Sequence, residues 1–152
     1  MRLGVISDTH GLLRPEVLAH LRGSDLIVHA GDIGDPAILA ELAQIAPVRA
    51  VRGNNDQGAW ARAIPESVTV EAGRARLYVL HDIAELDRGM ARCGLAAVVA
   101  GHSHMPRNEL VNGLLYFNPG SAGPRRFRLP IALGHIDVTE RGAVRGTIIR
   151  LD

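Results

Sequence analysis

Short apolar runs alternate with helix-like segments in the first third of the chain. Leu3–Ser7, Asp25–His29 and Val48–Val51 are rich in Val, Ile and Leu and too short for helices, so they predict buried strands. Arg14–Leu21 and a segment over about Asp35–Ile45 each carry a proline in the first turn, which predicts helices there. This β-α-β-α-β order predicts parallel strands joined by right-handed crossovers.

The remainder of the chain predicts mostly antiparallel pairs, because turn residues such as Asn112-Gly113 separate its apolar runs. A further helix is expected from about Ala84 to Cys93. Two mixed sheets packed together, with helices outside, fit this change from parallel to antiparallel organisation. The expected strands of this part are Val68–Val70, Arg76–Leu80, Ala97–Ala100, Glu109–Val111, Leu114–Phe117, Ile131–Val138 and Val144–Ile149.

Composition narrows the class of protein. A chain of 152 residues that is 47% hydrophobic is long enough for one well-buried domain, so residues 1–152 are expected to form a single domain. A net charge of +1 argues against strong nucleic-acid binding, and a chain without lysine has no lysine-based catalysis. The early polar pair Ser7-Asp8 and the lack of long apolar runs predict a cytoplasmic protein without membrane segments. Cys93, the only cysteine, excludes an intrachain disulfide and is expected to be a buried apolar residue.

Side chains with metal-binding chemistry follow the predicted strands. Since the carboxyl ends of parallel strands meet at one edge of a sheet, these side chains are expected to lie together. Seven of them are too many for one metal ion and suit two, which predicts a dinuclear metal hydrolase. The candidate ligands are Asp8, His10, Asp32, Asn54, His81, His102 and His104.

The chemistry of these groups suggests how they differ in role. The carboxylate of Asp32 has two oxygens and can bridge two ions, whereas the amide oxygen of Asn54 is a neutral ligand. The other histidines fall outside the pattern. His20 is expected on a helix surface, and His29 and His135 lie in apolar strands as hydrogen-bonded structural residues.

The order Asp-x-His, Gly-Asp, Gly-Asn-x-Asp, a lone His and Gly-His-x-His, between about Leu3 and Arg126, resembles the calcineurin-like metallophosphoesterases. The short length and Asn118-Pro119-Gly120-Ser121 resemble their small, YfcE-like phosphodiesterase branch. The resemblance implies a four-layer α/β/β/α sandwich of two mixed β-sheets flanked by helices. It assigns one ion to Asp8, His10, Asp32 and His104, and the other to Asp32, Asn54, His81 and His102, with Asp32 as the bridge.

The resemblance further implies a phosphodiesterase in which metal-bound hydroxide attacks phosphorus directly, with Asp32 and Asn54 as catalytic residues. Mixed nitrogen and oxygen ligands suit manganese, iron, nickel or zinc better than magnesium or calcium alone. The resemblance makes Mn²⁺ the first choice, with Fe, Ni, Zn or Mg as the other candidates. Larger relatives have a histidine where this chain has Asn55, so the general acid is unassigned. Asn54, Asn55, Arg125 and Arg126 are candidate substrate-binding residues, although the arginine pair also fits an exposed polar loop.

Two alternative functions share these features. A non-catalytic interaction module, similar to the small retromer subunit, uses the same fold but has no need of seven intact ligands. A phosphomonoesterase acting on nucleotides or phosphoproteins shares the metal chemistry and differs in its substrate. The expected partner of the phosphodiesterase is a small-molecule phosphoester substrate. Two smaller expectations remain open: Asp82 is a helix N-cap or a hydrogen-bond partner of a ligand, and Trp60 with an apolar sheet edge supports a homo-oligomer.

Overall fold

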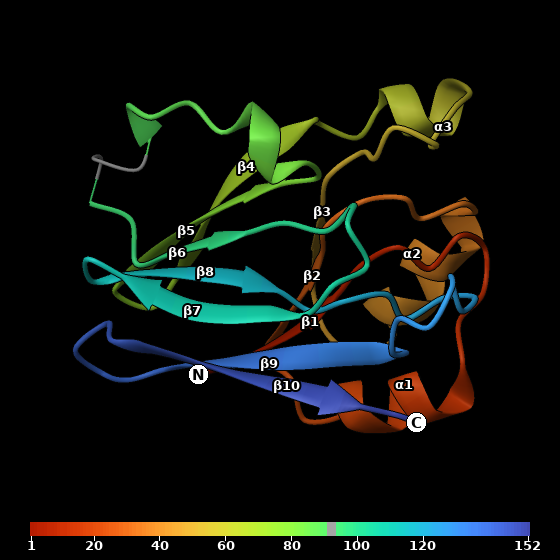
Figure 1. Ribbon diagram of the computed structural model, residues 1–152. Coiled ribbons are helices and arrows are strands. Elements are labelled where there is room, and N and C mark those ends of the chain that lie inside the picture. Colours follow the sequence, from red (N-terminus) through yellow and green to blue (C-terminus); the bar gives the residue numbers. More distant parts are fainter. Residues whose placement is uncertain (91–93) are drawn as a thin grey trace.

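The computed structural model describes residues 1–90 and 94–152, which form two five-stranded sheets and a few short helices (Figure 1). The predicted strands are all present, with ends that differ by a few residues. Cys93 lies outside the described residues, so its expected burial stays a prediction. No helix in the described part of the chain is both long and apolar enough to cross a membrane.

Sheet A contains the predicted parallel unit. Its strand order is β10-β9-β1-β2-β3, in which β1, β2 and β3 are parallel and β9 and β10 are antiparallel to their neighbours. The strand nearest the C-terminus therefore extends the sheet that the N-terminus begins. The bounds are β1 Arg2–Ile6, β2 Leu26–His29, β3 Val48–Ala50, β9 Ala132–Val138 and β10 Val144–Arg150.

Sheet B has the order β4-β5-β6-β8-β7 and combines two antiparallel hairpins with the strand β6, which is parallel to both neighbours. Asn112 and Gly113 both have positive φ, as the predicted tight turn between β7 and β8 requires. The bounds are β4 Ser67–Ala72, β5 Ala75–Leu80, β6 Ala97–Val99, β7 Arg107–Val111 and β8 Leu114–Asn118.

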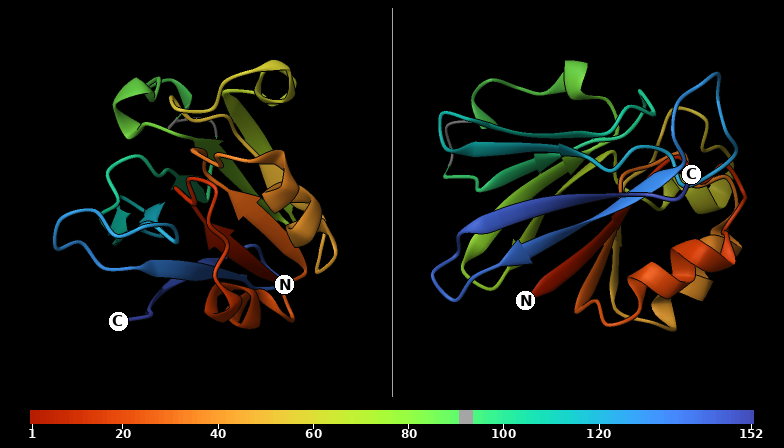
Figure 2. Two further views of the ribbon diagram at one scale, coloured as in Figure 1. Left: turned by 90° about the vertical axis from the view of Figure 1, so that its right-hand side faces the viewer. Right: turned by 60° about the horizontal axis from the view of Figure 1, so that its bottom comes forward.

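The sheets pack face to face around a core that includes Val5, Leu77, Val99, Phe117 and Ile136. Helices α1 (Pro15–Leu21) and α2 (Pro36–Ala43) bury their apolar sides against the outer face of sheet A (Figure 2). A third apolar cluster covers the outer face of sheet B. The predicted α/β fold of two mixed sheets with flanking helices is confirmed.

Two helices differ from expectation. The predicted helix from Ala84 is replaced, in its described part, by one 3₁₀ turn, η1 (Ile83–Glu85). The Asp87 side chain accepts a hydrogen bond from the Gly89 N–H at 2.9 Å, and this local bond competes with helical pairing. The sequence also failed to predict α3 (Ala59–Arg62), a single turn after Gly58.

Candidate metal centre

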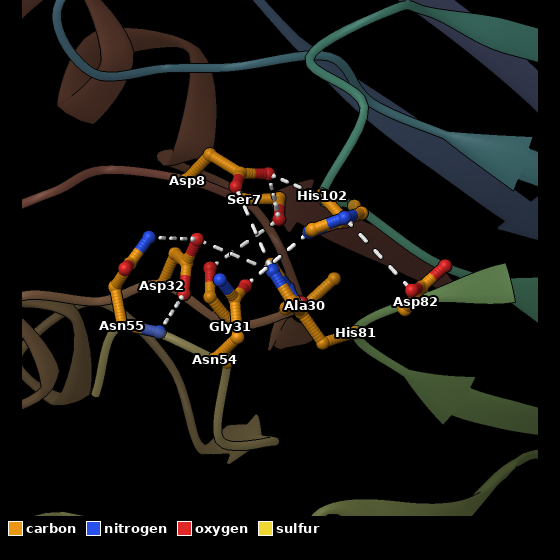
Figure 3. A network of polar contacts seen from close by, with 12 residues as sticks. Ser7, Asp8, Ala30, Gly31, Asp32, Asn54, Asn55, His81, Asp82 and His102 are labelled. Carbon is orange, nitrogen blue, oxygen red and sulfur yellow. Dashed lines mark hydrogen bonds and ion pairs between the residues drawn. The ribbon is translucent and has the colours of Figure 1, made fainter. Parts of the chain in front are cut away.

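The carboxyl ends of strands from both sheets bring the seven predicted ligands to one edge of the molecule. Figure 3 shows five of them, Asp8, Asp32, Asn54, His81 and His102, turned toward one another. Sheet A alone supplies four ligands, and the packing of sheet B beside it brings the other three. The ligands and the strands they follow are Asp8 and His10 (β1), Asp32 (β2), Asn54 (β3), His81 (β5), and His102 and His104 (β6).

The buried side chains that could bind metal form two groups, Asp8 with His10 and His104, and Asp8 with Asp32 and His81. Asp8 belongs to both groups. In the first group, Asp8 Oδ1 lies 3.3 Å from His104 Nε2 and 3.7 Å from His10 Nε2. In the second, His81 Nε2 lies 3.2 Å from Asp32 Oδ2 and 3.9 Å from Asp8 Oδ1. Asp32 Oδ2 also lies 3.7 Å from His10 Nε2, so its carboxylate faces both groups. Each group has ligand atoms within 4.8 Å of one another and could hold a metal ion.

Hydrogen bonds orient two of the histidine ligands. His81 Nδ1 donates to the Ala30 carbonyl at 2.7 Å, which leaves Nε2 facing the carboxylates as the atom able to bind a metal. His102 Nδ1 lies 3.2 Å from Asn54 Oδ1, and its Nε2 lies 3.8 Å from Asp82 Oδ2. His102 and Asn54 therefore stand together at the more exposed side of the second group.

The same donors account for most of the unpaired buried polar atoms. Seven buried side-chain nitrogen or oxygen atoms among the described residues have no hydrogen-bond partner, and five of these belong to Asp8, His10, His81 and His104. An unpaired buried polar atom costs about 1–3 kcal/mol, so such atoms are rarely left without a function. Divalent cations would satisfy these atoms, and the mixed nitrogen and oxygen donors suit them chemically.

The backbone at the ligands is strained. Asp8, His10, Asp32, His102 and His104 have φ of 56°, 46°, 55°, 70° and 61°, in the left-handed region that side chains with a Cβ disfavour. They make up five of the seven non-glycine residues with positive φ in the described part of the chain. Each such conformation costs about 1–3 kcal/mol, and clusters of them are typical of functional sites.

Close backbone packing explains the glycines of two motifs. A Cβ on Gly53 would collide with the Asp32 carboxylate, and a Cβ on Gly101 would collide with the Ser7 hydroxyl. Ser7 Oγ donates to Asp8 Oδ2 at 2.7 Å, and the His102 N–H donates to the same oxygen at 3.0 Å. Asp8 is thus held through Oδ2, and its Oδ1 remains directed at the histidines.

The fragment Gly53-Asn54-Asn55-Asp56 contributes structure as well as a ligand. The Asn55 N–H and its side-chain amide donate to the two oxygens of Asp32, at 2.9 and 3.1 Å. Asp56 accepts hydrogen bonds from the backbone N–H groups of Ile33, Gly34 and Gly53, at 3.1, 2.9 and 2.9 Å. These bonds connect the loops after β2 and β3. The side-chain amide of Asn55, a predicted substrate-binding residue, is therefore hydrogen-bonded to Asp32.

The buried His29 connects the loops that follow β1 and β2 through hydrogen bonds. His29 Nδ1 accepts from the Gly31 N–H at 3.1 Å, so its proton is on Nε2, which lies 3.0 Å from Thr9 Oγ1. The Thr9 hydroxyl in turn donates to the Ile33 carbonyl at 2.8 Å. Burial lowers the pKa of His29 to about 4, although nearby aspartates act in the opposite direction. The expected structural role of His29 is confirmed.

The electrostatics of the centre favour positive charge. Burial raises the pKa of Asp32, but the nearby His81 and the hydrogen bonds from Asn55 outweigh it, so the pKa lies well below the usual range. Burial lowers the pKa of His81, but the nearby Asp32, the Ala30 carbonyl and the charge of Asp8 outweigh this and raise it. The pairing of Asp32 with His81 contributes to both shifts, because each partner stabilises the charged form of the other.

A pocket of about 200 Å³ opens beside the second group of donors. Its walls include Asn54, His81 and His102, together with Arg52, a cation that sequence reasoning missed. Arg52 is two residues before Asn54, and residues at this spacing on an extended chain face the same side, which is the signal that could have found it. Arg52 pairs with the exposed Glu66 at 2.8 Å.

The remaining predicted residues have mixed outcomes. Arg125 pairs with Asp152 and its guanidinium lies 3.4 Å from the Leu129 carbonyl, while Arg126 is exposed on the same loop. Neither lines the pocket. Asp82 caps η1 by accepting from the Ala84 N–H at 3.0 Å, as expected.

The Asn-Pro-Gly-Ser turn supports the centre from the other side. The Asn118 amide donates to the Gly101 carbonyl at 3.0 Å and to Ser103 Oγ at 3.1 Å, next to the two histidines of that loop. The Ser121 hydroxyl donates to the Asp8 carbonyl at 3.0 Å. This segment is therefore a structural turn that braces two ligand loops.

Known proteins are similar to this chain in sequence and in fold. A probable metallophosphoesterase of Methanothermobacter thermautotrophicus is 35% identical over 133 residues, which cover 80% of this chain and 77% of that protein. The solved structure of an archaeal phosphodiesterase superposes with a TM-score of 0.79 at 23% identity, covering 98% of this chain and all of that one.

Two further solved structures share the fold at low identity. The phosphoesterase Yfce of E. coli superposes with a TM-score of 0.67 at 23% identity. Vps29 of Entamoeba histolytica, complexed with Zn²⁺, superposes with a TM-score of 0.75 at 20% identity. Each superposition covers all of this chain and all of the other chain. The sequence itself matches the calcineurin-like phosphoesterase superfamily domain over residues 1–141. The chain therefore belongs to the calcineurin-like phosphoesterase superfamily.

Proposed function

We propose that this protein is a phosphodiesterase that uses two divalent metal ions held by the seven predicted ligands. The observation that carries the proposal is the cluster of unpaired buried donors, in which Asp8 and Asp32 face histidines from both sheets. In this assignment, Asp8, His10, Asp32 and His104 hold one ion. The other is held by Asp32, Asn54, His81 and His102.

Two bound ions would supply Lewis acidity, which activates a water molecule and neutralises charge on the phosphoryl group. The protein supplies positioning. Ser7 and Asn55 hold the two aspartates through bonds of 2.7 and 3.1 Å, so the carboxylates need little reorganisation when a substrate arrives. No side chain is assigned as general acid, because Asn55 cannot donate a proton to a leaving group.

Substrate contacts are assigned to the polar pocket. Asn54 offers Oδ1 to His102 and keeps its amide N–H groups for a phosphoryl oxygen. Arg52 is better placed than Arg125 to contact a phosphate, because Arg52 lines this pocket and Arg125 does not. Mn²⁺ remains the first choice of metal on the strength of the family resemblance, and the mixed imidazole and carboxylate ligands also suit Fe, Ni or Zn.

The 152 residues are proposed to form one domain, because β9 and β10 complete the sheet that β1 begins. The rival function is an interaction module on the same fold. The Zn²⁺ complex of the similar Vps29 favours keeping this alternative, since it shows that the fold can hold a metal ion in a protein of that class. A phosphomonoesterase is the third candidate, and only turnover separates these functions.

The test is hydrolysis of bis-p-nitrophenyl phosphate and of p-nitrophenyl phosphate by chelator-stripped protein, with and without added Mn²⁺. The proposal expects metal-dependent cleavage with the diester faster. A preference for the monoester would change the substrate class, and no turnover of a folded protein with any divalent ion would favour the interaction module. Asp32→Asn should lower kcat at least about 100-fold and reduce the bound metal, because it weakens the ligand shared by both ions. Normal turnover and metal content in this variant would contradict the bridging role.

A further inference from the structure

A second cavity, of about 290 Å³, lies on the outer face of sheet B and is lined mainly by apolar side chains. Sheet B contributes Val98 and Tyr116, and Ala100 follows directly after β6. Ile83 comes from η1, and Met105 comes from the loop after His104. An apolar cavity of about 150 Å³ is already large enough to bind benzene, so this one can hold an aromatic ring with room to spare.

The polar groups in the wall are largely engaged within the protein. Ser103 Oγ accepts hydrogen bonds from the Met105 N–H at 3.2 Å and from the Asn118 amide at 3.1 Å. Asn118 Oδ1 accepts from the Gly120 N–H at 2.9 Å. A sugar or a second phosphate would find few free partners here, so the cavity suits an apolar group.

The rim of the cavity is also apolar. Ile83 is 38% exposed and Met105 is 57% exposed, which makes them two of the few large apolar side chains on the described surface. The Arg107 guanidinium is 4.7 Å from the centre of the Tyr116 ring and pairs with Glu109 at 2.9 Å. Arg107, the cation among the described residues of the wall, is therefore already paired with a neighbouring carboxylate.

The cavity adjoins the polar pocket of the metal centre along two segments of the chain. Asp82 and His102 line the polar pocket, and the next residues, Ile83 and Ser103, line the apolar cavity. Figure 3 shows Asp82 and His102 facing each other between these segments. A molecule whose phosphoryl group lies at the metal centre can therefore extend a substituent past this boundary.

We propose that the apolar cavity binds an aromatic or other apolar ester substituent of the phosphodiester, and this rests on the proposed function. The cavity would select diesters that carry such a group over those with small alkyl groups. Because its polar atoms are engaged, it would recognise the substituent by shape and apolar surface rather than by a hydrogen-bond pattern.

Binding of diphenyl phosphate, compared with dimethyl phosphate, tests the proposal in the protein loaded with diamagnetic Zn²⁺ and labelled at its methionine methyl groups. Diphenyl phosphate should shift the Met105 resonance in a saturable way, and dimethyl phosphate should not. Met1 and Met90, the other two methionines, lie outside the cavity lining and serve as internal controls. Met105→Asp should weaken the Kd of diphenyl phosphate at least tenfold by calorimetry. Leu110→Asp, which changes an exposed residue of β7 outside the cavity, should retain the wild-type Kd.

The outcomes separate the two proposals. Suppose that bis-p-nitrophenyl phosphate is cleaved, the Met105 resonance does not shift and Met105→Asp binds diphenyl phosphate with the wild-type Kd. The proposed role of the cavity is then wrong, and the proposed phosphodiesterase function stands. If the Met105 resonance shifts but no phosphodiester is cleaved, both the proposed phosphodiesterase function and the role of the cavity in substrate choice are wrong.

Discussion

The buried His29 should make the metal-free protein less stable in mild acid. Its pKa is about 4 in the folded protein, against 6.5 for an unperturbed histidine, chiefly because burial disfavours the charged ring. Below pH 6.5 the unfolded chain therefore binds a proton that the folded chain does not, so stability falls as the pH falls. The stabilisation is complete above the unfolded pKa and is lost by about pH 4.

The magnitude follows from the two pKa values. Between about pH 8 and pH 5, His29 should lower the free energy of unfolding by about 2 kcal/mol, and the full shift corresponds to about 3 kcal/mol. His29→Asn keeps an acceptor for the Gly31 N–H and removes the titration, so this variant should start less stable but lose about 2 kcal/mol less on acidification.

Urea unfolding at both pH values measures these differences, in chelator-stripped protein because metal binding is itself pH-dependent. His20→Asn is the matched control, since His20 is an exposed histidine on α1. The same pH dependence in His29→Asn as in the wild type would refute the reasoning, because it would mean that the buried ring does not exclude the proton.

Two predictions concern the groups that hold the aspartates. Ser7→Ala removes the 2.7 Å hydrogen bond to Asp8, so the affinity for Mn²⁺, measured by calorimetry, should fall about tenfold. The control Ser67→Ala, on β4, should leave the affinity unchanged. Equal affinities of Ser7→Ala and the wild type would show that Ser7 does not orient Asp8. Asn55→Ala should lower kcat about tenfold or less, because its N–H still donates to Asp32 after the side-chain bond is lost; a collapse in rate would assign Asn55 a direct part in the chemistry.

The side chains that could form the centre were recognisable without the structure. Asp8 and Asp32 each come shortly after an apolar run that predicts a strand, and glycines follow or precede these motifs. The parallel order of β1 to β3 then requires that their carboxyl ends lie together. The fold and the set of candidate ligands followed from these local signals.

The tertiary structure decided how these side chains act. His81 reaches Asp32 only because sheet B packs beside sheet A, and its proton is placed by the carbonyl of Ala30, which is far away in the sequence. The same contacts put Asn55 on Asp32 and Arg52 in the pocket. Hydrogen bonds and burial of this kind join residues distant along the chain, so no periodicity or spacing reports them.

Local competition explains the largest error in secondary structure. The apolar spacing after Ala84 is helical, but Asp82 caps a single 3₁₀ turn and the Asp87 side chain then bonds to the Gly89 N–H. The periodic pattern expresses only a weak local preference, and in the described part of this segment the side-chain hydrogen bonds of Asp82 and Asp87 outweigh it.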